Sequence, residues 1–234
     1  MMKKINIKDL IEFRRRSDKR RYAFVSKLET SNDNDTDISE GGRDYWVRSI
    51  TALSRAFKEN DNSIISDRID NIINDYEPNM LNKTKIMYDR NLQILHNFED
   101  YDFNELKPST KIEIIEKGRK EGIINIKNLP IKVLMHQVYS FKNEQDEKFI
   151  GSVLFLAKLD NYKPHELGIF AEAVYNFLIE NYSDKYFISP ENIRIIDVMS
   201  TVDINYQMVL NGDIPPLLNS TLDEIVKLKN EVGR

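Results

Sequence analysis

Apolar residues in the first half of the chain recur at three- and four-residue intervals, the spacing of one helix face. This spacing predicts one long helix over residues 7–28, another over about 44–58 and another over about 82–98. Ser63 is placed to cap a further helix whose isoleucines face inward, and Pro78 lies beyond its end. We therefore expect four helices before residue 100.

From residue 123 onward the pattern changes to short runs rich in β-branched and aromatic residues, which indicates strands. Five strands are predicted, over 123–127, 131–141, 149–159, 193–199 and 204–209. The run from Val153 to Ala157 is continuously apolar, which suits a central strand covered on both faces. Pro164 begins a long amphipathic helix, and Thr221 to Glu224 has the form of a capping box that opens a terminal helix.

These elements predict an α/β or α+β fold with a mixed central sheet of about five strands in the second half. The long amphipathic helix and the helical first half are expected to cover this sheet. We expect a mostly helical region over 1–110 and an α/β sheet region over 111–234, together forming one compact domain. Residues 29–40 contain five acidic residues and no basic residue, so we expect an exposed acidic loop there.

Composition narrows the classes of protein that the chain could belong to. The absence of cysteine excludes disulfides, thiolate nucleophiles and cysteine-built metal sites. No apolar run is long enough for a membrane-spanning helix and no signal sequence opens the chain, so we expect a cytoplasmic protein without a membrane partner. Abundant Asn, Lys and Ile are typical of AT-rich genomes, which favours a bacterial source.

The most unusual feature of the sequence is a basic cluster, in which six cations fall within eight residues. Its members are Arg14, Arg15, Arg16, Lys19, Arg20 and Arg21. Arginine side chains suit phosphate oxygens, and such a cluster can bind the backbone of a nucleic acid through counterion release. The cluster could equally be a solvated face that the acidic loop balances through Asp33, Asp35 and Asp37.

A second candidate site follows from the order of the elements over about 85–210. A helix, three strands, a long helix and a further strand resemble the core of the PD-(D/E)xK nuclease superfamily. Lys158, at the end of an apolar strand, matches the family's lysine. The resemblance implies Mg²⁺ or Mn²⁺ held by carboxylates. However, Leu156 and His136 stand where the family has acidic residues, which favours a relative that does not cleave.

Lys158, Asp197 and His136 are the catalytic candidates if the nuclease interpretation holds, and no cofactor other than Mg²⁺ or Mn²⁺ is expected. Asp197 lies within an apolar strand, where it either caps neighbouring backbone or belongs to a site. Three hypotheses therefore remain open. The leading one is a non-catalytic nucleic-acid-binding accessory protein, and the alternatives are a metal-dependent nuclease and a subunit of a larger bacterial assembly whose basic first helix docks on an acidic protein.

Overall fold

The computed structural model of the chain describes residues 3–30, 45–115 and 122–232. Most of the predicted acidic loop lies outside these ranges, and its first two residues instead end a helix. Within the described ranges the fold is mixed α/β with two sheets, which confirms the predicted fold class. Of the helices that these ranges contain, none has the length and apolar character needed to cross a membrane.

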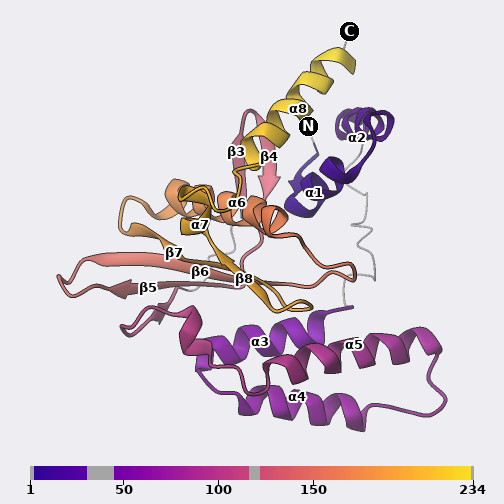
Figure 1. Cartoon of the computed structure of the whole chain (residues 1–234), viewed down its shortest axis with the longest axis vertical. Helices are drawn as coiled ribbons and strands as arrows, with labels where there is room; N and C mark the ends of the chain where they lie inside the picture. The colour runs from indigo at the N-terminus through magenta and orange to yellow at the C-terminus, as the bar shows by residue number, and fades with distance from the viewer. Residues whose placement is uncertain (1–2, 31–44, 116–121, 233–234) are drawn as a thin grey trace.

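A five-stranded sheet lies across the middle of the molecule in the order β2-β5-β6-β7-β8 (Figure 1). Its strands are β2 (Glu113–Ile114), β5 (Gln137–Lys142), β6 (Lys148–Leu156), β7 (Phe187–Asp197) and β8 (Val202–Asn205). Strands β6 and β7 are parallel, and the other neighbouring pairs are antiparallel. Side chains of β6 alternate between the two faces and are buried on both, because a layer of helices covers each side.

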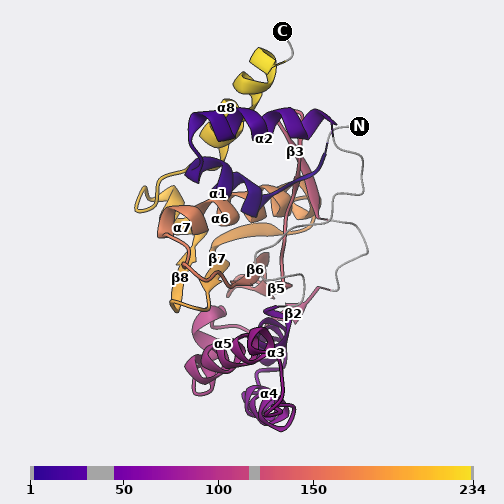
Figure 2. The same cartoon turned by 90° about the vertical axis from the view of Figure 1, so that its right-hand side faces the viewer.

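Helices of the first half cover one face of this sheet (Figure 2). They are α3 (Val47–Glu59), α4 (Ser63–Asn74), α5 (Asn82–Phe98) and the short 3-10 helix η1 (Phe103–Leu106). Phe57, on α3, packs against Tyr139 and Phe155 of the sheet, with ring centroids 5.6 and 6.5 Å away. This layer forms a separate hydrophobic core with the lower face of the sheet.

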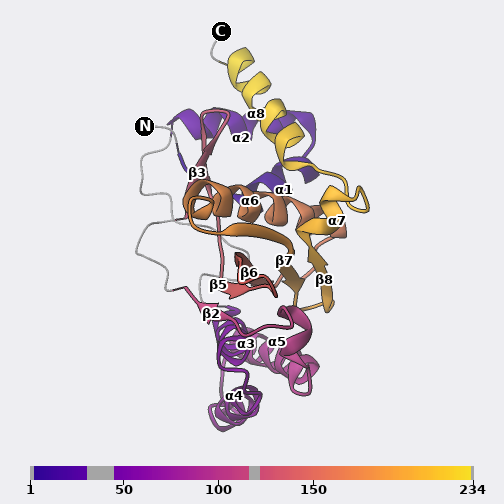
Figure 3. The same cartoon turned by 90° about the vertical axis from the view of Figure 1, so that its left-hand side faces the viewer.

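The opposite face is covered by α6 (Pro164–Tyr182), with a second set of elements outside it (Figure 3). These elements are α1 (Ile7–Arg15), α2 (Asp18–Thr30), α7 (Tyr206–Leu210), α8 (Leu218–Val232) and a small sheet. The small sheet has the order β1-β4-β3 and consists of β1 (Ile5–Asn6), β4 (Leu129–Lys132) and β3 (Ile123–Ile126). The first thirty residues therefore lie with the second half of the chain.

The prediction of one helix over 7–28 is wrong. Arg16 has extended backbone angles, with φ −81° and ψ 152°, so α1 ends at Arg15 and α2 begins at Asp18. The break allows α2 to pack beside α8. The helix predicted to be capped by Ser63 exists, but Asn62 precedes it and Ser63 is already its first residue.

Three boundaries in the second half also differ from the prediction. The run over 131–141 is divided between β4 of the small sheet and β5 of the large one. The run over 204–209 is mostly α7, because the Asn205 side chain accepts a hydrogen bond from the Met208 amide and caps that helix. Helix α8 begins before the predicted capping box, and Glu172 of α6 accepts hydrogen bonds from the amides of Leu217 and Leu218 at its start.

Asn91 holds the helical layer together. Its side chain is fully buried, and its amide group donates to the backbone oxygens of Tyr45 and Met87 at 2.8 Å. Its carbonyl oxygen accepts from the Ser49 amide at 3.0 Å and from the Ser49 hydroxyl at 2.9 Å, which ties α5 to the start of α3. All the hydrogen-bonding groups of this buried amide are thus used.

Replacing Asn91 by Ala is expected to lower the free energy of unfolding by roughly 2–4 kcal/mol, because the Ser49 and Tyr45 backbone groups lose their partner. Urea unfolding followed by circular dichroism measures this change. Asn71→Ala, on the exposed face of α4, is the matched control and should alter stability little. Equal stability of the two variants would contradict the role assigned to Asn91.

Candidate nucleic-acid interface

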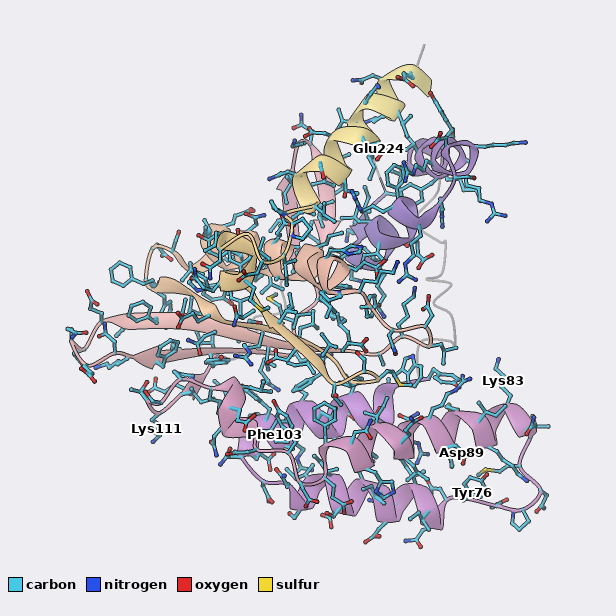
Figure 4. The ribbon with its side chains drawn as sticks, in the orientation of Figure 1. Tyr76, Lys83, Asp89, Phe103, Lys111 and Glu224 are labelled. Carbon is cyan, nitrogen blue, oxygen red and sulfur yellow. The ribbon has the colours of Figure 1, made fainter. Side chains whose placement is uncertain are left out.

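The basic cluster does not face solvent as a whole, because three of its arginines bind other parts of the chain. Arg15 donates to both oxygens of Glu166 and to Asp160, each at 2.6 Å. Arg21 forms an ion pair at 2.6 Å with Glu224, a residue on the side of α8 that faces α2 (Figure 4). Arg14 donates to the hydroxyl of Thr221 at 3.0 Å. These three side chains anchor α1 and α2 to α6 and α8.

The remaining cations lie on the outer side of the break between α1 and α2. Lys19 and Arg20 are exposed, and neither has an ion-pair partner within the described part of the chain. The Arg16 guanidinium lies 5.1 Å from the centroid of the Phe24 ring, at cation–π distance. Phe24 in turn packs on Phe13 with ring centroids 5.6 Å apart, so the aromatic surface beneath Arg16 is fixed by the core.

A cavity of about 280 Å³ opens on this side of α2 and is lined by Arg16, Arg20, Ala23, Phe24 and Lys27. These positions recur at helical intervals along one face, so three cations surround one aromatic ring. We call this set the basic face of α2. Clustered cations beside an aromatic ring are the combination that single-stranded nucleic acids favour, through phosphate contacts and base stacking.

Lys158 lies in a different environment, a network of charges between α1 and the start of α6. Its ammonium is 3.1 Å from a Glu12 oxygen and 3.0 Å from an Asp160 oxygen, and the side chain is only 13% exposed. Asp160 also binds Arg15, which binds Glu166. Two cations and three carboxylates thus form one connected network that neutralises most of its own charge.

The pKa values of the acids in this network reflect their cationic partners. Burial raises the pKa of Glu166, but hydrogen bonds from Arg15 and from the Lys163 amide outweigh it, so that the pKa is lowered. The pKa of Asp160 is also lowered, because Lys158 and Arg15 offset the smaller effect of its burial. Both groups are therefore carboxylates at neutral pH, paired with cations.

Asp197 has a structural role at the end of β7. Its carboxylate is completely buried and accepts hydrogen bonds from the Tyr162 amide at 2.9 Å, the Met199 amide at 3.1 Å and the Ser200 hydroxyl at 2.9 Å. Of the two roles that the sequence left open for Asp197, the capping of neighbouring backbone is thus observed. These bonds fix the loop that carries Tyr162, whose ring lies 5.8 Å from the Lys158 ammonium.

His136 continues the pairing of β5 with β6. Its backbone amide donates to Val153, and its Nδ1 accepts from the Phe155 amide at 3.0 Å. Its ring stacks against Phe155, with ring centroids 6.2 Å apart. His136 is thus built into the sheet, and within the described ranges no three or more His, Asp or Glu side chains gather where they could hold a metal ion.

Three residues of these two sites were not predicted from the sequence. Glu12 was assigned no role, although it forms an ion pair with Lys158. Phe24 and Lys27 were missed because the prediction of one continuous helix hid the register of α2. Counting from the break at Arg16, the helical interval would have placed both beside Arg20.

Comparison with protein-family models, with curated proteins and with solved structures finds no match to this chain.

Replacing Arg15 by Met is expected to lower the free energy of unfolding by roughly 3 kcal/mol, because Glu166 is then left buried without its partner. Urea unfolding measures the change, and Lys19→Met, four residues away and exposed, is the control. Adding Glu166→Gln to the Arg15 variant should recover part of the loss, since it removes the unpaired charge. An Arg15 variant as stable as the Lys19 variant would disprove the anchoring role.

Proposed function

We propose that this chain is a nucleic-acid-binding accessory protein of a bacterial cytoplasm and that it binds without cleaving. The observation that carries the proposal is the basic face of α2, where Arg16, Arg20 and Lys27 surround Phe24 on an open cavity. Phosphate groups would bind the cations, and an unpaired base would stack against the ring. Such contacts read backbone and strand character rather than sequence.

Retention of the charge on this face supports the proposal. Arg14, Arg15 and Arg21 have hydrogen-bond or ion-pair partners within the fold, so the phosphate contacts expected of the cluster now rest on Arg16, Lys19 and Arg20. Their side chains project from a helix that those inward-facing arginines hold in place. The net charge of −4 does not prevent such binding, because phosphate contacts depend on the local concentration of cations.

The nuclease alternative is less favoured by the geometry. Lys158 is already paired with Glu12 and Asp160, and Asp197 accepts three hydrogen bonds that hold a loop. Neither side chain is left to orient a water or to bind Mg²⁺ or Mn²⁺ without breaking those contacts. This alternative predicts metal-dependent cleavage that is lost in Lys158→Ala.

One observation favours the alternative of a subunit in a larger assembly. Large apolar side chains are exposed where α4 is joined to α5, at the end of the helical layer that carries Tyr76 in Figure 4. They are Ile73, Tyr76, Leu81 and Ile86. Exposed apolar groups of this kind are typical of protein contacts. This alternative predicts that one partner protein co-purifies with the chain and that the chain is not retained on nucleic acid.

The double variant Arg16→Gln/Arg20→Gln is expected to weaken binding to single-stranded DNA and RNA. It should also lower the slope of log affinity against log salt concentration by about 2, since each lost phosphate contact removes slightly less than one unit. Fluorescence anisotropy of labelled 20-nucleotide strands at several salt concentrations measures both quantities.

The charge-matched control is Lys58→Gln/Lys83→Gln, which also removes two exposed cations but lies in the helical layer, where Figure 4 marks Lys83. Its affinity and salt slope should stay close to those of the unmodified protein. Equal weakening by the two double variants would mean that only overall charge matters, and the basic face of α2 would then not be the site.

A further inference from the structure

A second cleft lies at the far end of the large sheet from α2, where a tight turn joins β5 to β6 (Figure 1). It has a volume of about 370 Å³, and the residues that matter here are Thr110, Lys111, Glu113, Lys142, Lys148 and Tyr186, all in its lining. This volume is within the range of small-ligand sites. The cleft shares no residue with the basic face of α2.

Positive charge is concentrated in this cleft by the register of the strands. Lys142 and Lys148 are directly paired across β5 and β6, and Lys111 enters the cleft from the segment before β2. Like charges directly opposite each other on neighbouring strands are destabilising. A sheet that places them together in a cleft has an arrangement that an anion would relieve.

The acids around these lysines leave most of the charge uncompensated. Lys142 pairs with Asp146 in the turn at 2.6 Å, and Glu113 is the acid that lines the cleft. For Lys111 and Lys148, no ion pair is formed with any residue that the structure describes. Two lysine ammonium groups therefore face the cleft with only one carboxylate beside them.

An unsatisfied hydroxyl supplies an independent observation. The Thr110 Oγ1 atom is buried, and in the described ranges it is the buried side-chain polar atom without a hydrogen-bond partner. Buried polar groups are nearly always hydrogen-bonded in folded proteins, and one that is not requires an explanation. Thr110 lines the cleft, so a ligand bound there could accept the missing hydrogen bond.

From this arrangement we infer that the cleft is a binding site for a phosphate group. Lysine ammonium groups bind phosphate as point charges, and the Thr110 hydroxyl would donate to one of its oxygens. Tyr186 provides a ring at the side of the cleft against which the organic part of a phosphate ester would pack. The phosphate could belong to a small phosphate ester or to the 5′ end of a nucleic-acid strand.

The double variant Lys142→Gln/Lys148→Gln tests the inference. In isothermal titration calorimetry of the full chain at constant ionic strength, we expect saturable binding of inorganic phosphate and of adenosine monophosphate. The dissociation constant should rise at least about tenfold in the variant, which corresponds to about 1.4 kcal/mol. The Lys58→Gln/Lys83→Gln control should leave it unchanged. No saturable binding, or equal loss in both variants, would overturn the inference.

Replacing Thr110 by Val gives a second, opposite pair of readouts. Without ligand, this variant should melt at a higher temperature, because an isosteric methyl replaces a buried hydroxyl that has no partner. Its affinity for phosphate should nevertheless fall, and Thr110→Ser, which keeps the hydroxyl, should restore binding. A lower melting temperature for the Val variant would show that the hydroxyl already has a partner.

The source of the phosphate can be identified with two oligonucleotides of the same sequence. If the 5′-phosphorylated strand binds more tightly than both the 5′-hydroxyl strand and adenosine monophosphate, and only when Lys142 and Lys148 are present, the site takes a strand end. If adenosine monophosphate binds as well as the phosphorylated strand does, the site takes a free phosphate ester. Either result is independent of the basic face of α2, which the Arg16→Gln/Arg20→Gln variant removes separately.

Discussion

Strand β6 imposes the constraint on which the rest of the structure depends. It lies at the centre of the large sheet, and its residues from Val153 to Ala157 are buried on alternate faces. Val153 and Phe155 belong to the core beneath α3–α5, whereas Leu154 and Leu156 belong to the core beneath α6. A strand that is apolar on both sides cannot leave either face open to water, so the chain must supply a helical layer for each.

The second layer brings its own polar groups into the interior, and these organise the outer elements. Helix α6 is almost entirely buried, yet it carries Glu166 and Glu172 among its buried residues. Glu166 binds Arg15 of α1, and Glu172 accepts hydrogen bonds from the first amides of α8. Because a buried carboxylate requires a partner, these two acids determine where α1 and α8 attach to the fold.

The same requirement divides the cations of the chain into structural and available ones. Arg15 and Arg21 satisfy carboxylates on neighbouring helices, which fixes α2 so that its other cations project outward around Phe24. At the other end of the sheet, strand register rather than helix packing brings Lys142 and Lys148 together. The chain is acidic overall, but both regions present positive charge in a cavity, and local charge of this kind attracts phosphate.

Local patterns in the sequence determined the type of most elements and the class of the fold. The apolar intervals of α5 and α6 and the continuous run in β6 depend only on near neighbours, so they could be read along the chain. The break at Arg16 and the division of 131–141 between two sheets could not, because they depend on which distant segment each stretch packs against. Arg15 shows the reason, since its partner Glu166 lies 151 residues away and its charge looks the same in sequence as that of Arg16. Sequence alone therefore located the cations, and only the tertiary structure decided which of them are paired inside the fold and which remain to meet a ligand.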